Sequence, residues 1–300
     1  MMYQPPPGFH AVFETDLHQR CLESRFVLES VGIRSEAIHH DRQWILIVAE
    51  ADAEQSSHEL ASYIQETRDQ AEQVGAPVPT YGGAVIGAVI YAWIVMLIAI
   101  LMGTSAMGYD WLSAGRMQSG LVMEGQWWRN VTALTLHLDI GHIASNLVFG
   151  IVFGLLAGRA LGGGIAWLVI VLAGSLGNLI NAFVQAAEHT SIGASTAVFA
   201  ALGVLVSHAL RPSRSAHERP LKRWSPMIGG VLLLAFTGVG GERTDVTAHV
   251  TGFLAGLALG WAAASMPSVW LANRRVQQIA GIAAVALVAV AWSLALTSNS

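Results

Sequence analysis

The chain has 300 residues, of which 53% are hydrophobic and only 12% are charged, with a formal net charge of -4. This composition excludes an ordinary soluble domain and indicates a membrane protein. Apolar stretches long enough to cross about 30 Å of hydrocarbon begin only after residue 80. The first of them, Ala84–Gly103, carries no charge at all.

The amino-terminal residues 1–78 are predicted to form a small acidic α+β domain in the cytosol. The first eighty residues contain thirteen Asp and Glu against five Lys and Arg, and they lack the basic start and short apolar core of a signal peptide. Residue spacing predicts the order β-α-β-β-α. The strands are expected at 11–14, 33–39 and 44–48, and the helices at 15–31 and 53–68.

No catalytic or metal-binding cluster is expected in this domain. His39 and His40 are adjacent, so on a strand they point to opposite faces. Cys21 is the single cysteine, which excludes an intrachain disulfide. Residues 79–83 are predicted to link this domain to the membrane region.

Seven apolar segments are predicted to cross the membrane as helices. They lie at Ala84–Gly103, Ile143–Leu161, Ile165–Val184, Ile192–Leu210, Met227–Val239, Val246–Ser265 and Ile279–Leu296. The fifth segment is short and could extend backwards from Pro226. The predicted fold is therefore an all-α polytopic bundle, with six spans in residues 84–265 and a cytosolic loop and seventh span in residues 266–300.

The orientation of the bundle follows from Lys and Arg, which accumulate in cytosolic loops. With a cytosolic amino terminus, the inner loops hold Arg159, Arg211, Arg214, Arg219, Lys222, Arg223, Arg274 and Arg275. The outer loops then hold only Arg116, Arg129 and Arg243. This distribution predicts an amino terminus inside and a carboxyl terminus outside. The Trp-rich stretch 104–130 is then outside and is expected to lie in the membrane interface.

Polar side chains are costly within membrane spans, so each one raises a functional hypothesis. The candidates are His142, Asn146, Asn178, Asn181, Ser195, His208 and His249. Ser195 and His249 are both expected about one turn below the outer surface, on the fourth and sixth spans. A serine hydroxyl needs an adjacent base in order to attack, and histidine is the usual one. The two residues could form such a pair, although a lone Ser or His in a span more often serves helix packing.

Two neighbouring features favour acyl-transfer chemistry at Ser195. Gly193 and Ala194 precede the serine and leave the backbone accessible to a substrate carbonyl. His142 and Asn146 are spaced i, i+4 at a similar depth, so both face the same way. They could donate hydrogen bonds to an oxyanion, or they could bond to a neighbouring helix.

A stripe of glycines follows His249 along the sixth span, at Gly252, Gly256 and Gly260. Such a stripe lets two helix backbones approach closely. The expected partner is the fourth span, whose small residues are Ala194, Ala197, Ala201 and Gly203. Close packing of these spans would bring Ser195 within reach of His249.

Jointly, these residues resemble the rhomboid proteases. The signatures are Trp128-Arg129, His137, His142-x-x-x-Asn146, Gly193-Ala194-Ser195 and Ala248-His249-x-x-Gly252-x-x-x-Gly256, in the family's order. The resemblance covers about residues 84–265 and implies a six-helix rhomboid core. It implies Ser195 as nucleophile and His249 as general base. It also implies an oxyanion hole made by His142, Asn146 and the Ser195 backbone amide, and an aromatic residue, Phe199, stacked on the histidine.

One position departs from the family pattern, because Thr196 stands where the family usually has glycine. Its branched side chain could narrow the oxyanion site or alter helix packing. Arg129 is expected to anchor the outer loop in the interface. Asp139 and Asp245 could orient His249 as the acid of a triad, but the resemblance implies a dyad, and a loop Asp is more often solvated.

The resulting hypothesis is an intramembrane serine endopeptidase that needs no metal or cofactor. It would cleave single-span membrane proteins near the outer face of the bilayer through an acyl-enzyme, in a bacterial inner membrane, with no nucleic-acid partner. The alternative is a rhomboid-like protein that binds transmembrane segments without cutting them. Retention of Ser195 and His249 favours the protease. A transporter lacks support, because there is no repeated half and no pair of broken helices.

Overall fold

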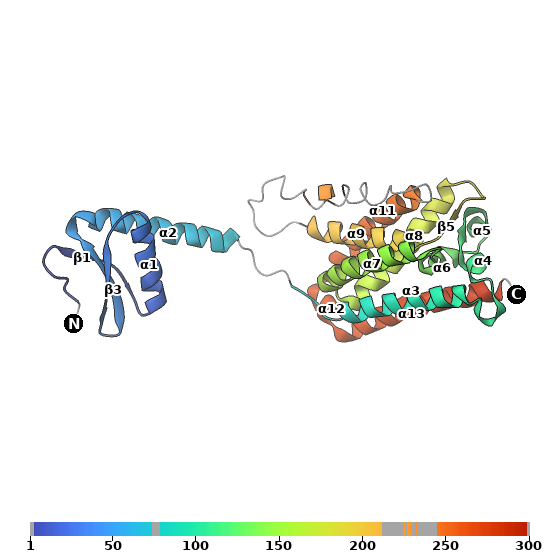
Figure 1. The fold of residues 1–300 in the computed structure, drawn as a ribbon, viewed down its shortest axis with the longest axis horizontal. Helices are drawn as coiled ribbons and strands as arrows, with labels where there is room; N and C mark the ends of the chain where they lie inside the picture. The colour runs from blue at the N-terminus through green and yellow to red at the C-terminus, as the bar shows by residue number, and fades with distance from the viewer. Residues whose placement is uncertain are drawn as a thin grey trace. The chain divides into compact units, whose positions relative to one another are not determined.

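The computed structural model describes residues 3–73, 79–211, 225, 227–229, 232 and 245–298. The chain divides into two compact units, Met1–Pro77 and Val78–Ser300, which are described separately (Figure 1). Most of the predicted fifth span, Met227–Val239, lies outside the described residues. Several cationic loop residues used for the orientation lie outside them as well, namely Arg214, Arg219, Lys222, Arg223 and Arg243.

The first unit is a three-stranded antiparallel sheet with two helices. Its elements are β1 (Phe9–Thr15), α1 (His18–Ser30), β2 (Ser35–His40), β3 (Gln43–Ala49), the 3-10 turn η1 (Glu50–Asp52) and α2 (Ala53–Gln73). The strand order is β1-β3-β2, so the apolar β3 is central and its middle residues are buried. Its core includes Cys21 and Leu28 from α1 and Leu60 from α2. Burial raises the pKa of the Cys21 thiol, so the thiol stays protonated and unreactive, and Cys21 serves the packing of this core.

The second unit contains five helices that are long and apolar enough to cross a membrane. They are α3 (Ala84–Gly103), α7 (Ile140–Leu161), α8 (Gly163–Val184), α11 (Val246–Ala264) and α13 (Arg274–Thr297). They coincide with the first, second, third, sixth and seventh predicted spans, although several begin a few residues earlier. The chain is thus an integral, polytopic membrane protein.

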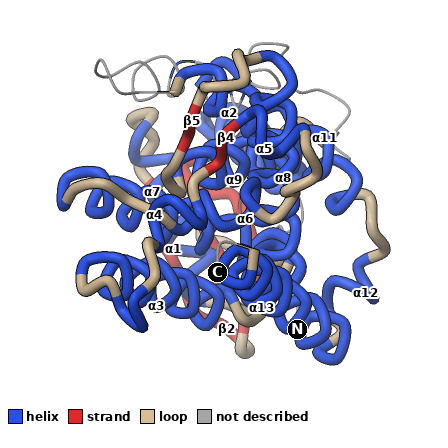
Figure 2. The backbone as a smooth tube through the Cα atoms, turned by 90° about the vertical axis from the view of Figure 1, so that its right-hand side faces the viewer, coloured by secondary structure: helices blue, strands red, loops and turns tan. Residues whose placement is uncertain are grey.

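The predicted fourth span is shorter than expected, because its helix α9 runs only from Ser195 to Ala209, 15 residues. The residues before it are not helical. Thr190–Ser191 form a short strand, β5, which pairs with β4 (Met117–Gln118) in antiparallel fashion (Figure 2). Gly193 has φ +126°, a conformation that a helix cannot contain. Ser195 is consequently the first residue of its helix, and the predicted start of the fourth span at Ile192 was three residues too early.

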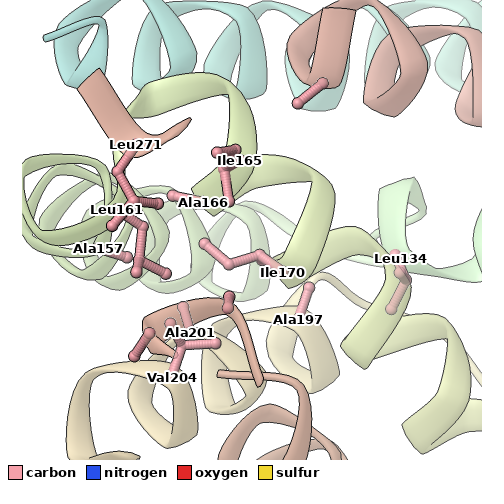
Figure 3. Close-up of a cluster of buried hydrophobic side chains, with 13 residues drawn as sticks. Leu134, Ala157, Leu161, Ile165, Ala166, Ile170, Ala197, Ala201, Val204 and Leu271 are labelled. Atoms are coloured by element: carbon pink, nitrogen blue, oxygen red, sulfur yellow. The ribbon is translucent and has the colours of Figure 1, made fainter. Parts of the chain in front are cut away.

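Helices α9 and α11 pack closely, as the glycine stripe predicts. A Cβ on Gly252 would overlap the carbonyl of Thr196, and one on Gly256 would overlap the carbonyl of Ala200. The small residues Ala197 and Ala201 do not supply this contact. They face a buried apolar cluster shared with α7 and α8 (Figure 3). Gly203, which was also predicted, does supply it, because a Cβ there would overlap the Phe253 carbonyl of α11. The close approach therefore uses Thr196, Ala200 and Gly203 on α9.

Residues 104–139 form short elements between α3 and α7. These are η2 (Ala106–Gly108), α4 (Trp111–Gly115), β4, α5 (Ser119–Met123), α6 (Arg129–Thr132) and η3 (Ala133–Thr135). Arg129 is only 2% exposed, so it is not an interfacial anchor. Its guanidinium donates to Gln126 Oε1 and to the carbonyls of Ser113 and Arg116, at 2.6 to 2.9 Å. These bonds hold the segment together, because buried carbonyls need donors.

The short helix α12 (Ser268–Ala272) precedes α13, whose first turn is fixed by Gln277. Gln277 Oε1 accepts from the backbone amides of Gly164 and Ile165, both at 3.0 Å. Its Nε2 donates to the carbonyls of Leu161 and Leu271. The start of α8 has no side-chain cap of its own. Gln277 therefore caps α8 from a distant part of the chain.

Candidate active site

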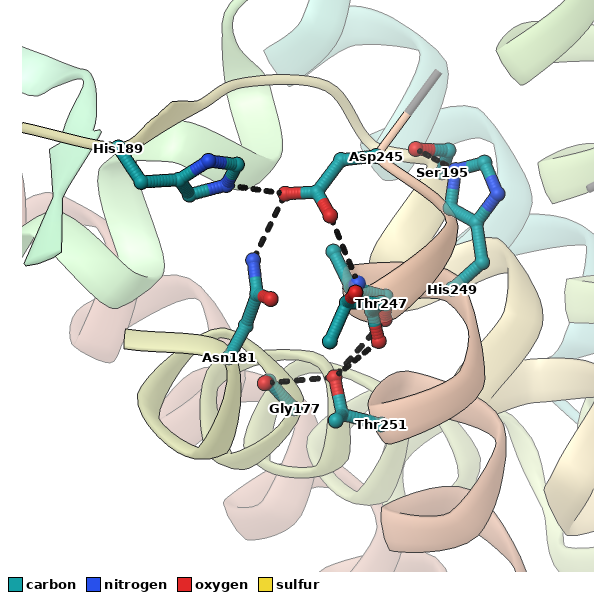
Figure 4. A network of polar contacts seen from close by, with 9 residues as sticks. Gly177, Asn181, His189, Ser195, Asp245, Thr247, His249 and Thr251 are labelled. Carbon is teal, nitrogen blue, oxygen red and sulfur yellow. Dashed lines mark hydrogen bonds and ion pairs between the residues drawn. The ribbon is translucent and has the colours of Figure 1, made fainter. Parts of the chain in front are cut away.

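Ser195 and His249 lie side by side at the starts of α9 and α11 (Figure 4). His249 Nε2 is 2.8 Å from Ser195 Oγ. His249 is 6% exposed, and Ser195 is half-buried. The ring of Phe199, one turn after the serine, lies 4.4 Å from the imidazole between centroids. Both the predicted pairing and the predicted aromatic contact are thus present in the geometry.

The backbone just before Ser195 is held in a fixed turn. The amide of Gly193 donates to the Ala133 carbonyl at 2.9 Å, and the amide of Ala194 points to His137 Nε2 at 3.4 Å. A Cβ on Gly193 would lie 2.7 Å from Nε2 of His142 and 3.5 Å from Ser195 Oγ. Only glycine fits this position, for reasons of both space and positive φ. The same distances show that the His142 ring lies close to Ser195.

Asn146 follows His142 by one helical turn on α7 and is 5% exposed. Its Nδ2 is buried and has no hydrogen-bond partner among the described residues. Its backbone is fixed by Tyr91, whose hydroxyl donates to the Asn146 carbonyl at 2.8 Å. A buried amide donor without a partner is costly, so this group is available to a ligand oxygen. At the start of α9 the N-cap residue Ala194 provides no side-chain cap, and the Ser195 amide is among the first backbone donors of this helix.

His137 acts as a hydrogen-bond acceptor beside this turn. It is 3% exposed, and burial, together with the nearby His142, lowers its pKa to about 4 despite the opposing effect of Asp139. The ring is therefore neutral at physiological pH, as acceptance from the Ala194 amide requires. His137 and His142 contact each other edge to face, with centroids 5.0 Å apart.

Thr196 is 2% exposed and packs between helices. Its Cγ2 methyl lies 3.1 Å from a Cβ built on Gly177 of α8 and 2.9 Å from one built on Gly252 of α11. Of the two effects expected of this residue, the structure favours helix packing over narrowing of the site. The two facing glycines provide the space for the extra methyl group.

The two acidic residues considered for a triad both cap helices. Asp139 accepts from the His142 amide at the start of α7, at 2.7 Å. Asp245 Oδ1 accepts from the Ala248 amide at the start of α11, at 3.0 Å. Asp245 is not solvated as expected: its side chain is 15% exposed, and Oδ2 is bound by Asn181 and His189 (Figure 4). His189 could not be recognised from the sequence, because an isolated loop histidine belongs to no spaced motif.

Two other polar residues of the spans lie in different surroundings. Asn178 Nδ2 donates to the Asn130 carbonyl at 2.9 Å, which joins α8 to α6. His208 lies near the end of α9, far along the helix from Ser195. Four of the seven candidates, Ser195, His249, His142 and Asn146, gather at the starts of α7, α9 and α11. Asn181 reaches the start of α11 through its bond to Asp245.

The fold and this site define a polytopic membrane protein with a serine and a histidine paired at one end of its helical bundle. Residues 124–266 match the Rhomboid domain. This match, and the similarity to curated rhomboid proteases, confirm for that region the resemblance of its motifs to the rhomboid family.

Several curated proteins named as rhomboid proteases are similar to this chain. It is 29% identical over 177 residues to Rhomboid protease GluP of Bacillus subtilis (strain 168), which covers 59% of the chain and 33% of GluP. It is 33% identical over 148 residues to Rhomboid-like protease 2 of Toxoplasma gondii, covering 47% and 49% of the two proteins. It is 25% identical over 138 residues to Putative rhomboid protease YdcA of Bacillus subtilis (strain 168), covering 46% and 68%. The chain thus spans a third of GluP and about half of Rhomboid-like protease 2.

Proposed function

We propose that this protein is an intramembrane serine endopeptidase that works through a Ser195–His249 dyad. The observation that carries the proposal is the 2.8 Å contact between Ser195 Oγ and His249 Nε2. A hydroxyl within hydrogen-bond reach of an imidazole nitrogen is the arrangement required for nucleophilic catalysis. The names of the relatives, which are called proteases, support the same reaction class.

In this mechanism Ser195 Oγ attacks the scissile carbonyl carbon while its proton passes to His249 Nε2. The carbonyl oxygen becomes an oxyanion, which Asn146 Nδ2, the His142 ring and the Ser195 amide would stabilise. When the intermediate collapses, the C–N bond breaks and His249 gives its proton to the leaving amine. An acyl-enzyme on Ser195 remains. Water then attacks the ester with His249 as base, which releases the acid and restores the serine.

Phe199 and Gly193 support this chemistry without taking part in it. Phe199 contacts the face of the imidazole and restricts its tilt. Gly193 keeps the space between His142 and Ser195 open, where a carbonyl oxygen would sit. Gly252 allows the approach of α9 and α11 that brings the dyad together.

Substrates of this site would be single-span membrane proteins, because the dyad lies at the ends of membrane helices. Cleavage would occur near the outer face of a bacterial inner membrane, with the amino terminus in the cytosol. The cationic loop residues support this orientation.

The test is cleavage of a model single-span substrate by the purified full chain in liposomes. Protein with Ser195 intact should cut the substrate, and Ser195→Ala protein should not. A rhomboid-like protein that only binds transmembrane segments would retain the substrate without cutting it. That outcome in the unaltered, folded protein would overturn the proposal.

A further inference from the structure

We propose that Asp245, held by His189 and Asn181, is a positioning residue that sets His249 at hydrogen-bond distance from Ser195. The inference rests on the proposed function. The three residues form a network beside the dyad, drawn from α8, the loop before β5, and the start of α11 (Figure 4).

The carboxylate of Asp245 is fully engaged. Asn181 Nδ2 donates to Oδ2 at 2.7 Å, and His189 Nε2 lies 2.9 Å from the same oxygen. Oδ1 accepts from the Ala248 amide. Burial alone would raise the pKa of Asp245, but these hydrogen bonds and one from Ser191 hold it below its usual value. The group therefore stays ionised, and His189 donates through Nε2–H.

This network fixes the first turn of α11, on which His249 lies. The Asp245 carbonyl accepts from the His249 amide at 3.2 Å, so the cap and the imidazole belong to the same turn. Further along α11, Thr251 Oγ1 lies 2.9 Å from the Gly177 carbonyl of α8, and the Thr247 and Ala248 carbonyls of its own helix share the same hydroxyl at 2.9 and 3.1 Å. His249 thus stands between two polar links to α8. Links on both sides of a residue restrict rotation and sliding of the helix there.

His189 is itself held by a rigid part of the chain. The amide of Ser119 donates to the His189 carbonyl at 3.0 Å, and the amide of Gly120 donates to the Ala187 carbonyl at 2.9 Å. The strands β4 and β5 pair directly after it. These bonds hold the backbone of His189 against residues 117–120. The imidazole in turn contacts Asp245, so it links these residues to the start of α11.

Positioning of this kind acts on rate, because misplacement of a catalytic group by about 1 Å can cost on the order of a hundredfold. It predicts a specific pattern among substitutions. Asp245→Asn keeps an oxygen to cap Ala248 but turns an amide NH₂ toward the donors His189 and Asn181. His189→Leu removes one donor. His189→Gln restores an N–H donor at similar reach.

The experiment measures the second-order rate constant for modification of Ser195 by a fluorophosphonate probe, with the melting temperature of each full-length variant. Asp245→Asn and His189→Leu should lower the rate constant by about tenfold or more. His189→Gln should recover most of the loss. Gln277→Leu is the matched control: it breaks a buried polar link between helices at the opposite end of α8. It should lower the melting temperature and leave the rate constant unchanged.

The outcomes separate the two proposals. If the unaltered protein is not modified more than Ser195→Ala protein, the proposed function falls, and the positioning role falls with it. If the unaltered protein reacts and His189→Leu reacts equally fast, only the positioning role is overturned. His189→Leu carries the test if Asp245→Asn does not fold. Equal losses in His189→Leu and His189→Gln would also contradict it, because the donor would then be irrelevant.

Discussion

His249 Nε2 lies 2.8 Å from Ser195 Oγ, although the two residues are 54 positions apart in the sequence and lie on different helices. If they act as a unit, Ser195→Ala and His249→Ala should each abolish cleavage of a model transmembrane substrate without unfolding the bundle. The double variant should be little worse than either single one. Ser207→Ala is a matched control, since Ser207 is another serine of α9, and its hydroxyl donates to the Val204 carbonyl of the same helix. Substantial cleavage by Ser195→Ala protein would exclude the dyad.

The proposed oxyanion donors should act on kcat and leave substrate affinity nearly intact, because they act mainly on the transition state. We expect Asn146→Ala and His142→Ala each to lower kcat by about tenfold to a thousandfold. Asn178→Ala provides the contrast. It breaks an existing hydrogen bond to Asn130, so it should lower the melting temperature more and kcat less. Unchanged kcat in both folded site variants would reduce His142 and Asn146 to structural residues.

Thr196 offers a prediction about packing. Its methyl group fills the space beside Gly177 and Gly252. Thr196→Ser removes that methyl and should cost about 1 kcal/mol of stability, with turnover unchanged. Thr196→Gly should cost more, because glycine adds up to about 1 kcal/mol of helix penalty. Melting temperature and kcat should be measured on the same preparation. A rise in kcat for Thr196→Gly would mean that the threonine does crowd the oxyanion site.

His137 predicts an acid-dependent loss of stability. Its pKa in the folded protein is about 4, below the ordinary 6.5, so the unfolded chain binds more protons between these values. The stability it contributes is present above pH 6.5 and is lost progressively as the pH falls toward 4. Between pH 7 and pH 5 the loss should be on the order of 2 kcal/mol. His137→Gln keeps an acceptor for Ala194 but does not titrate, so its melting temperature should depend less on pH. Identical pH profiles of the two proteins would contradict this role.

The first unit should be dispensable for chemistry. Residues 1–77 form a compact unit with their own core, and every proposed catalytic group lies beyond residue 130. Deletion of residues 1–78 should therefore leave measurable cleavage in detergent, compared with the same truncated chain carrying Ser195→Ala. A folded but fully inactive truncated protein would show that this unit takes part in the active state.

The features that sequence predicted best depend on local patterns. The apolar lengths of α3, α7, α8, α11 and α13 predicted these helices, because hydrocarbon thickness sets the length of a span. The glycine stripe after His249 predicted the approach of α9 and α11, since only residues without a Cβ allow it. The Ser195–His249 contact followed from that approach.

Features that depend on tertiary contacts could not be predicted from the sequence. The late start of α9 results from the β4–β5 pairing and the positive φ of Gly193, which hydropathy does not detect. Arg129 was expected in the interface, but carbonyls from distant residues bury it. Asp245 was expected in solvent, but His189 and Asn181 meet it only in the folded chain.

The central claim is that Ser195 is a nucleophile activated by His249. The most direct measurement is the mass of the purified full chain after treatment with a fluorophosphonate, followed by peptide mapping of the adduct. We predict one adduct per chain, located on Ser195, absent in Ser195→Ala and formed far more slowly in His249→Ala. Folded protein that remains unmodified, or that is modified equally after Ser195→Ala, would contradict the claim.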